Sequence, residues 1–191
     1  MAHPIEHLKK IFKLSPAQIE QVNTLIVEKQ MPKGSFIERS NQLIESYYIK
    51  KGAARAFYTK DGKEHTIAFA FEDEYLIATL IYANAPMTIT VTFLEDTEII
   101  YIPHSKLKET LDNITTEKSP EALLFFHTAL QQYLTYLEER LYVFQSMNAK
   151  ERYDWVIARY PRLLECATVT QISSFLGLTK ETLYRIRSGK Y

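Results

Sequence analysis

The stretch that most constrains the fold of this chain is TVTQISSFLGLTKETLYRIR, residues 168–187. Its apolar residues recur at helical spacing on both sides of Gly177, where a helix end commonly adopts a left-handed backbone. These apolar residues are Ile172, Phe175, Leu176, Leu178, Leu183 and Ile186. Thr168 with Gln171 has the spacing of a capping box, and Thr179 stands at the expected N-cap of a second helix. Together these signals predict a helix-turn-helix.

The second of these helices predicts a contact with DNA. Its first turns carry the polar and charged side chains with which a recognition helix faces base edges in the major groove. Arginine pairs bidentately with guanine, glutamate accepts from cytosine, and threonines near a helix N-terminus suit phosphates. The residues that we expect at DNA are Thr168, Thr170, Gln171, Thr179, Lys180, Glu181, Thr182, Tyr184, Arg185 and Arg187. The alternative is a solvated surface helix.

The composition predicts a packed, soluble protein, because 46% of the 191 residues are hydrophobic. No run reaches about 18 apolar residues, and the N-terminal MAHPIEHLKK lacks the apolar centre of a signal peptide. We therefore expect a cytoplasmic protein with no membrane partner. Cys166 is the single cysteine, so an internal disulfide and a cysteine-ligated cluster are excluded, and we expect it to be a small buried hydrophobe.

The net charge of zero conceals an asymmetry along the chain. Residues 147–191 contain eight basic and four acidic side chains, a net charge of +4, so residues 1–146 carry −4. This split fits a phosphate-facing C-terminal module on a mildly acidic N-terminal domain.

The N-terminal part reads as a helix followed by many short strands. Residues 4–29 have a helical pattern with a start at Ser15-Pro16. From Ser35 to Pro103 short runs rich in Tyr, Phe, Ile and Thr predict antiparallel strands, with a hairpin turn at Asp61-Gly62 and a second turn at Lys51-Gly52. This spacing predicts a jelly roll. A short helix, KLKETL, is expected after His104-Ser105.

A long helix is predicted from about Pro120 to Gln145, with Ser119 as its cap. Its apolar residues form one broad stripe, which must be buried either on the chain's own barrel or, as we favour, against the same helix of a second copy. The stripe consists of Leu123, Phe126, Leu130, Tyr133, Leu137, Leu141 and Phe144. A hinge over residues 147–150 and a helix ended by Pro161 follow.

This order of parts resembles the Crp/Fnr-type transcription regulators over essentially the whole chain. The strongest stretches are ESYYIKKGAARAFYTKDGKEHTIAF, similar to a cyclic-nucleotide-binding sheet, and AKERYDWVIARYPRLLE with FLGLTKETLYRIR, similar to the DNA-binding half. The resemblance implies an α+β chain: a double-stranded β-helix sensor over residues 1–118, a dimerisation helix over 119–146 and an all-α helix-turn-helix domain over 147–191. It also implies double-stranded DNA, a second copy and RNA polymerase as partners.

The resemblance further implies that Lys180, Glu181 and Arg185 read base edges, whereas Thr168, Thr170, Thr179 and Thr182 meet phosphates. Lys180 departs from the arginine often found there and loses its fork geometry. Only SGKY follows the second helix, where related proteins continue into a β wing, so we expect weaker sequence-independent affinity for DNA.

The charged residues that hold a cyclic nucleotide in such regulators are missing. Ile77-Ala78 stands at the Gly-Glu position and Met87-Thr88 at the Arg-Ser position of the phosphate cassette. Residues 64–105 include seven acids and no Lys or Arg, so a buried phosphate would be an unpaired anion among anions. We therefore expect no cofactor and no usual cyclic AMP binding. The cations that could still reach in are Lys50, Lys51 and Arg55.

Two questions stay open for this region and for the whole chain. Apolar residues around the cassette either collapse into core, which we favour, or line a cavity for an uncharged ligand. No metal site or catalytic residue is predicted, because the five histidines are scattered and no P-loop, nucleophile elbow or dinucleotide fingerprint occurs. The rival to a DNA-binding regulator is a β-roll protein whose helix-turn-helix binds another protein.

Overall fold

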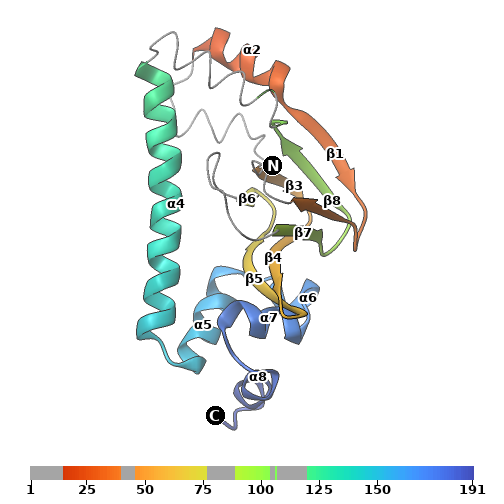
Figure 1. Cartoon of the computed structure of the whole chain (residues 1–191), viewed down its shortest axis with the longest axis vertical. Helices are drawn as coiled ribbons and strands as arrows, with labels where there is room; N and C mark the ends of the chain where they lie inside the picture. The colour runs from red at the N-terminus through yellow and green to blue at the C-terminus, as the bar shows by residue number, and fades with distance from the viewer. Residues whose placement is uncertain (1–14, 40–45, 77–88, 104–105, 107–119) are drawn as a thin grey trace.

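The chain folds into two antiparallel sheets that face each other, followed by a long helix and a group of short helices (Figure 1). The structure is a computed structural model and describes residues 15–39, 46–76, 89–103, 106 and 120–191. One sheet has the strand order β1-β8-β3-β6 and the other β2-β7-β4-β5. All pairs between these strands are antiparallel, which is the arrangement of a jelly roll.

Among the described elements, helix α2 precedes the strands and the other helices follow them, as expected for this α+β fold. The strands are β1 Val27–Met31, β2 Phe36–Arg39, β3 Tyr47–Lys51, β4 Ala54–Lys60, β5 Lys63–Ala70, β6 Glu74–Leu76, β7 Ile89–Phe93 and β8 Thr97–Tyr101. The helices are α2 Pro16–Leu25, α4 Pro120–Ser146, α5 Ala149–Arg159, α6 Leu163–Cys166, α7 Val169–Leu176 and α8 Lys180–Arg187. The helix expected after His104-Ser105 lies outside the described residues except for Lys106.

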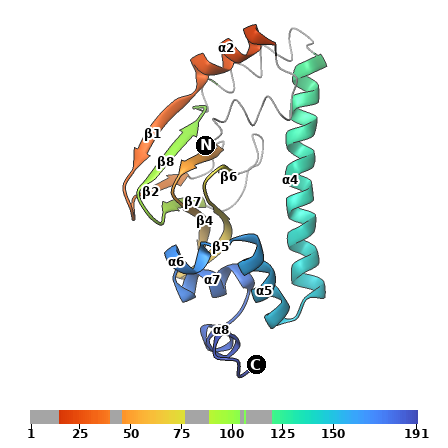
Figure 2. The same cartoon turned by 180° about the vertical axis from the view of Figure 1, so that it is seen from behind.

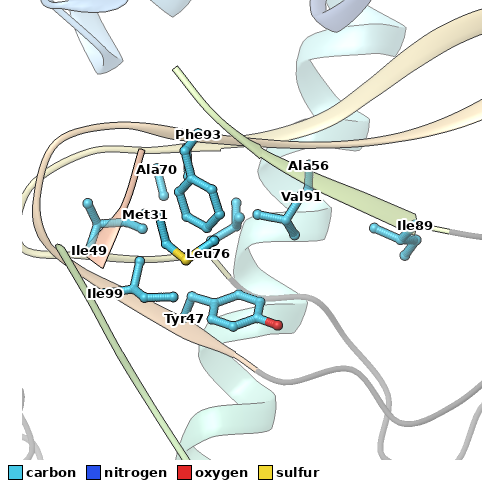
Figure 3. Packing of buried hydrophobic residues seen from close by; sticks show 11 residues of the cluster. Met31, Tyr47, Ile49, Ala56, Ala70, Leu76, Ile89, Val91, Phe93 and Ile99 are labelled. Carbon is cyan, nitrogen blue, oxygen red and sulfur yellow. The ribbon is translucent and has the colours of Figure 1, made fainter. Parts of the chain in front are cut away.

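Side chains that alternate along the strands fill the space between the two sheets. In β7 the buried positions are Ile89, Val91 and Phe93, with half-buried threonines between them. Figure 3 shows Val91 and Phe93 in one cluster with Tyr47 and Ile49 of β3, and Ile89 at the edge of that cluster. The one charged side chain that is buried among the described residues is Arg55, whose neighbours Ala54 and Ala56 face the interior. Within the described residues, the interior of the roll is therefore an apolar core.

The predicted hairpin turn at Asp61-Gly62 joins β4 to β5. Both residues have positive φ, 52° and 72°, and Lys60 pairs with Lys63 across the turn. Positive φ at both central residues matches the twist of a two-residue hairpin, which is why the Asp-Gly pair predicts it from sequence.

The N-terminal helix is shorter than the sequence pattern predicted. Pro16 begins α2 as expected, but the helix ends at Leu25, and residues 27–31 form strand β1, which the sequence analysis missed. Val27 pairs with Tyr101 and Met31 with Thr97, so hydrogen bonding to β8 outweighs the helical pattern of this stretch.

The C-terminal helices gather at one end of the roll. The long helix is confirmed as α4, which runs alongside the sheets in both views (Figures 1 and 2). The connector after it is Met147–Asn148 only, shorter than the expected hinge, because Asn148 caps α5 in a capping box with Glu151. Both views place α8 at the opposite end of the molecule from α2.

Candidate nucleic-acid interface

Helix α8 buries one face and presents the other to solvent. Thr179 is its N-cap, and its hydroxyl accepts from the backbone N–H of Thr182 at 3.1 Å. Leu183 and Ile186 are buried, and Leu183 belongs to a cluster with residues of the neighbouring helices. Five of the residues predicted at DNA form the exposed face, while Thr182 is half-buried. They are Lys180, Glu181, Tyr184, Arg185 and Arg187.

Helix α7 has the caps that the sequence predicted. The Thr168 hydroxyl accepts from the N–H of Gln171, and the Gln171 side chain accepts from the N–H of Thr168 at 2.8 Å. The Gln171 amide oxygen is therefore occupied by the cap, whereas Thr168 and Thr170 are exposed. Gly177 ends the helix at φ 65°. The N–H of Leu178 donates to the Ser173 carbonyl, which closes a Schellman motif.

Gly177 is required by packing as well as by its backbone conformation. A Cβ atom built there would lie 2.8 Å from Cε1 of Phe144 on α4. The turn between α7 and α8 is therefore pressed against the end of the long helix.

The unpaired positive charge of the C-terminal helices is concentrated on α8 and the residues that follow it. Of the eight basic side chains in residues 147–191, the first four are paired: Lys150 with Asp154, Arg152 with backbone carbonyls, and Arg159 and Arg162 with carboxylates of the sheet domain. The other four have no ion pair among the described residues. These are Lys180, Arg185, Arg187 and Lys190.

Helix α7 covers an edge of the sheet. Strand β5 is the outermost strand of its sheet, so its outer N–H and C=O groups lack a strand partner. The N–H of Thr66 donates to Oγ of Ser174 at 2.9 Å, and that hydroxyl donates to the carbonyl of Glu64 at 2.9 Å. Ser174 thus satisfies two backbone groups of the strand, and the Thr66 hydroxyl donates to the carbonyl of Gln171 at 3.3 Å.

The same contact is continued by apolar residues. Phe69, Phe71 and Leu94 of the sheet domain are buried in one cluster with the core of α5, α6, α7 and α8. The Phe69 and Phe175 rings meet edge to face, 5.1 Å between centroids. Each large side chain removed from water contributes about 1.5–3 kcal/mol. The C-terminal helices therefore share a hydrophobic core with the outer face of the sheet.

Ion pairs border this shared core. Arg162 donates to Oε2 of Glu72 and, at 2.7 Å, to Oε1 of Glu95, and these carboxylates raise the pKa of its guanidinium. Arg159 donates to Oε1 of Glu74 at 2.6 Å. All of these side chains are partly exposed, so each pair contributes about 0–1 kcal/mol, less than the apolar contacts.

Arg152 joins the end of α4 to the end of α7. Its guanidinium donates to the carbonyls of Met147, Leu176 and Phe144 at 3.0, 3.3 and 2.7 Å. Carbonyls at a helix C-terminus lack partners within the helix, and a cation there also meets the negative end of the helix dipole. One side chain thus fastens the connector between α4 and α5 to α7.

Helix α4 has two different apolar faces. Its inner face packs on the chain itself: Arg140 lies 3.8 Å from the Phe175 ring centroid, Val143 is buried, and Tyr136 donates to the Ile67 carbonyl. Phe144, predicted at the dimer interface, also lies here, against Gly177. The outer face leaves large side chains exposed by 41–61%. They are Leu134, Leu137, Leu141 and Tyr142.

The remaining residues of the predicted stripe are placed only in part. Tyr133 is half-buried. Leu123, Phe126 and Leu130 lie in the part of α4 whose side chains are not described. The outer face found here consists of Leu137 and Leu141 from the predicted stripe, together with Leu134 and Tyr142, which the sequence pattern did not select.

The cassette residues Ile77, Ala78, Met87 and Thr88 lie outside the described residues. The cations suggested as substitutes can be placed. Arg55 is 2% exposed and donates to Thr66 and, at 2.7 Å, to Glu64. Its neighbours Ala54 and Ala56 belong to the interior cluster, so by strand alternation Arg55 lies on the outer face of the sheet. Lys50 pairs with Glu28 and Glu98, and Lys51 is exposed.

No metal centre is found in the part of the chain that the structure describes, where no group of three or more His, Cys, Asp or Glu side chains is placed to hold a metal ion. The Cys166 thiol is half-buried, and burial raises its pKa to about 11. Burial therefore disfavours the thiolate, which is the reactive form of the side chain. None of the described helices is long and apolar enough to span a membrane.

Comparison with known families agrees with this geometry. Residues 28–113, which include β2 to β8 and all of β1 except Val27, match the family model of the cyclic nucleotide-binding domain. No curated protein sequence matches the chain significantly. The two sheets are thus similar to the cyclic nucleotide-binding domain, and the similarity of the longer chain to Crp/Fnr-type regulators rests on solved structures.

Three solved structures illustrate the wider fold. A protein from Eubacterium rectale assigned to the Crp/Fnr family of transcriptional regulators has a TM-score of 0.67 at 18% identity, over 95% of this chain and 85% of that one. FixK2 from Bradyrhizobium japonicum has a TM-score of 0.64 at 20% identity, over 86% of this chain and 83% of that one. CLP, a c-di-GMP-responsive global regulator from Xanthomonas campestris, has a TM-score of 0.65 at 12% identity, over 92% of this chain and 91% of that one. The chain thus has the fold of Crp/Fnr-type regulators.

Sequence reasoning missed the residues that hold the C-terminal helices on the sheet. Ser174 reads as an ordinary polar residue of a short helix, and Arg162 was counted only as part of a basic tail. Their partners lie 67–110 positions earlier in the chain. The negative charges of Glu72 and Glu95 are opposite to that of Arg162, which makes them possible partners. No local sequence pattern, however, indicates that these residues meet.

Proposed function

We propose that this chain is a cytoplasmic DNA-binding transcription regulator of the Crp/Fnr type, with α8 as the helix that enters the major groove. The observation that carries this proposal is the gathering of cations without an ion pair among the described residues on the exposed face of α8 and just after it, while the other cations of the C-terminal helices are paired. Electrostatic attraction to phosphates needs free cations, and base reading needs exposed side chains. Tyr184, 57% exposed, stands amid Lys180, Glu181 and Arg185 on that face.

The proposed regulator is a homodimer joined by the outer face of α4. Leu134, Leu137 and Leu141 follow one another at spacings of three and four, so they share one side of the helix. Phe144, Arg140 and Tyr136 occupy the inner side, which leaves the outer leucines without a partner among the described residues. A second copy would bring two α8 helices to successive major grooves about 34 Å apart.

The regulator does not respond to cyclic AMP through the usual phosphate cassette. Residues 64–105 contain no Lys or Arg, and Arg55, the nearest arginine before them, is engaged by Glu64 on the outer face of the sheet. A genuine cyclic-nucleotide response is the second candidate, which the family match of residues 28–113 favours. An uncharged apolar effector and RNA polymerase remain proposed partners, and a protein-binding role for α8 is the rival from another class.

The experiment is selection of genomic DNA fragments by the purified full chain, with and without cyclic AMP. Equal enrichment of a near-palindromic motif under both conditions supports the proposal. Enrichment only with cyclic AMP supports the second candidate, and no enrichment under either condition contradicts DNA binding by the chain alone.

Two variants locate the contact within the molecule. Arg185→Ala removes an exposed cation of α8, and we expect it to weaken binding to the selected site by about 1–3 kcal/mol and to relax selection at one base pair. Lys150→Ala is the control. Lys150 lies on α5 and not on α8, and its ammonium is already paired with Asp154 of the same helix at 2.6 Å. Unchanged binding by Arg185→Ala, or equal weakening in both variants, would exclude α8 as the reading helix.

A further inference from the structure

We propose that Arg159 and Arg162 form a latch with Glu72, Glu74 and Glu95 that sets the direction in which α8 points. Glu72 lies in the turn between β5 and β6, Glu74 begins β6, and Glu95 belongs to the turn between β7 and β8. Two separate turns of the sheet domain are thereby joined to one short stretch between α5 and α6. The latch itself is argued from these contacts, and its effect on DNA rests on the proposed function.

These polar contacts are needed to set the orientation of the C-terminal helices on the sheet domain, because apolar burial alone does not specify an orientation. Hydrophobic attraction is non-directional, whereas a guanidinium that donates to two carboxylates is held in one orientation. Arg162 donates through Nη1 to Glu72 and through Nη2 to Glu95. Arg159 adds a third pair from the last turn of α5, through Nη1 to Glu74.

A second attachment lies on a different strand and prevents rotation about the first. Ser174 of α7 bonds to the outer edge of β5 through Thr66 and Glu64. The latch holds the end of α5 and the start of α6, while Ser174 holds the middle of α7. The three ion pairs of the latch and the Ser174 attachment lie at separate points, and together they restrict rotation of the C-terminal helices. Helix α8 packs on these helices through Leu183.

The latch also determines where positive charge is available. Arg159 and Arg162 are neutralised by carboxylates of the sheet domain, so they are withheld from phosphates. If the latch opened, both arginines would add sequence-independent attraction to DNA, and the two α8 helices of a dimer would lose their fixed spacing. Opening would therefore favour non-specific over specific binding.

The first test needs no DNA. The Thr66 amide reports docking, because its hydrogen bond to Ser174 exists only when α7 lies on β5. Hydrogen exchange is measured in the full chain for Arg162→Glu, for the charge-exchanged Arg162→Glu/Glu72→Arg, and for Lys150→Gln as a control within α5. We expect exchange in residues 63–70 to accelerate about tenfold in Arg162→Glu, to slow again in the charge-exchanged variant, and to stay unchanged in the control.

Exchange in β1, which carries no latch residue, should be the same in all variants and shows that each variant is folded. The wild-type chain gives an independent measurement: raising salt from about 0.1 M to about 1 M should accelerate exchange in residues 63–70, because it screens partly exposed pairs. Unchanged exchange in folded Arg162→Glu, or no rescue by charge exchange, would overturn the latch.

The second test uses the DNA site selected by the wild-type chain. Arg162→Glu should weaken binding to the full two-half-site DNA about tenfold more than binding to a single half-site, because only the full site requires fixed spacing. An equal weakening on both would overturn the assignment of orientation to the latch. If the wild-type chain selects no DNA, the proposed function fails, but the hydrogen-exchange result on the latch is unaffected.

Discussion

At the scale of single residues, two separate features of the structure require glycine at position 177. Its φ of 65° lies in the left-handed region, and a Cβ there would meet Phe144 at 2.8 Å. We expect Gly177→Ala to destabilise the chain by about 1–2 kcal/mol for the backbone and a further 1–3 kcal/mol for the clash. The measurement is chemical denaturation of the variant and the wild type.

Gly189→Ala is the matched control for this prediction. Its φ of 70° imposes the same backbone cost, but nothing lies within 4 Å of the added Cβ. The difference between the two variants therefore isolates the clash with Phe144. Equal destabilisation by both would show that α4 and the turn after α7 are not in close contact.

The carboxyl of Glu72 predicts a pH dependence at the same scale. Burial raises its pKa, but hydrogen bonds from Arg162 and from the Gly52 N–H outweigh burial and hold the pKa below its ordinary value of 4.5. A lowered folded pKa means that the stabilisation is fully present above pH 4.5 and is lost as the pH falls through the folded value. The stability difference between wild type and Glu72→Gln should therefore shrink on acidification. A difference that grows in acid would contradict the pairing with Arg162.

At the scale of elements, the two faces of α4 have different tasks. The inner face carries Arg140 and Phe144 against α7, and the outer face exposes Leu137 and Leu141. We expect Leu137→Asp/Leu141→Asp to convert a dimer to monomers, a weakening of about 3 kcal/mol or more, because charges replace apolar anchors at an interface. Sedimentation measures the change, and circular dichroism checks that the monomers are folded.

The matched control for the α4 variant is Leu164→Asp. Leu164 is 40% exposed on α6, close to the 41% of Leu137, but it is not on α4. A dimer that survives the double change in α4 would place the interface on another surface. Dissociation of the dimer in Leu164→Asp would likewise place the interface on a surface other than the outer face of α4.

At the scale of the whole molecule, the distribution of paired and unpaired cations predicts how DNA binding depends on salt. Arg187→Gln removes a cation without an ion pair among the described residues, and it should reduce the slope of log affinity against log salt by about 1 if its guanidinium neutralises one phosphate. Lys150→Gln removes a cation already paired with Asp154 and should leave the slope unchanged. Titrations at several salt concentrations decide between these outcomes. Equal slopes for Arg187→Gln and wild type would show that Arg187 of α8 does not meet a phosphate.

The sequence by itself determined the features of the molecule that depend on near neighbours. The caps at Thr168 and Thr179, the end of α7 at Gly177 and the hairpin at Asp61-Gly62 all form within a few residues, so their signals are local. The exposed face of α8 was also predictable, because helical periodicity assigns Leu183 and Ile186 to the buried side.

Only the tertiary structure decided which surfaces meet. Residues 27–31 became strand β1 because β8 was available to pair with them, against a helical local pattern. The apolar stripe of α4 divided into an inner and an outer face because α7 and Phe175 lie beside it, and no sequence pattern specifies that neighbour. Ser174 and Arg162 acquired their roles from partners 67–110 positions away, because the energy of such contacts depends on the folded path of the chain and not on spacing along it.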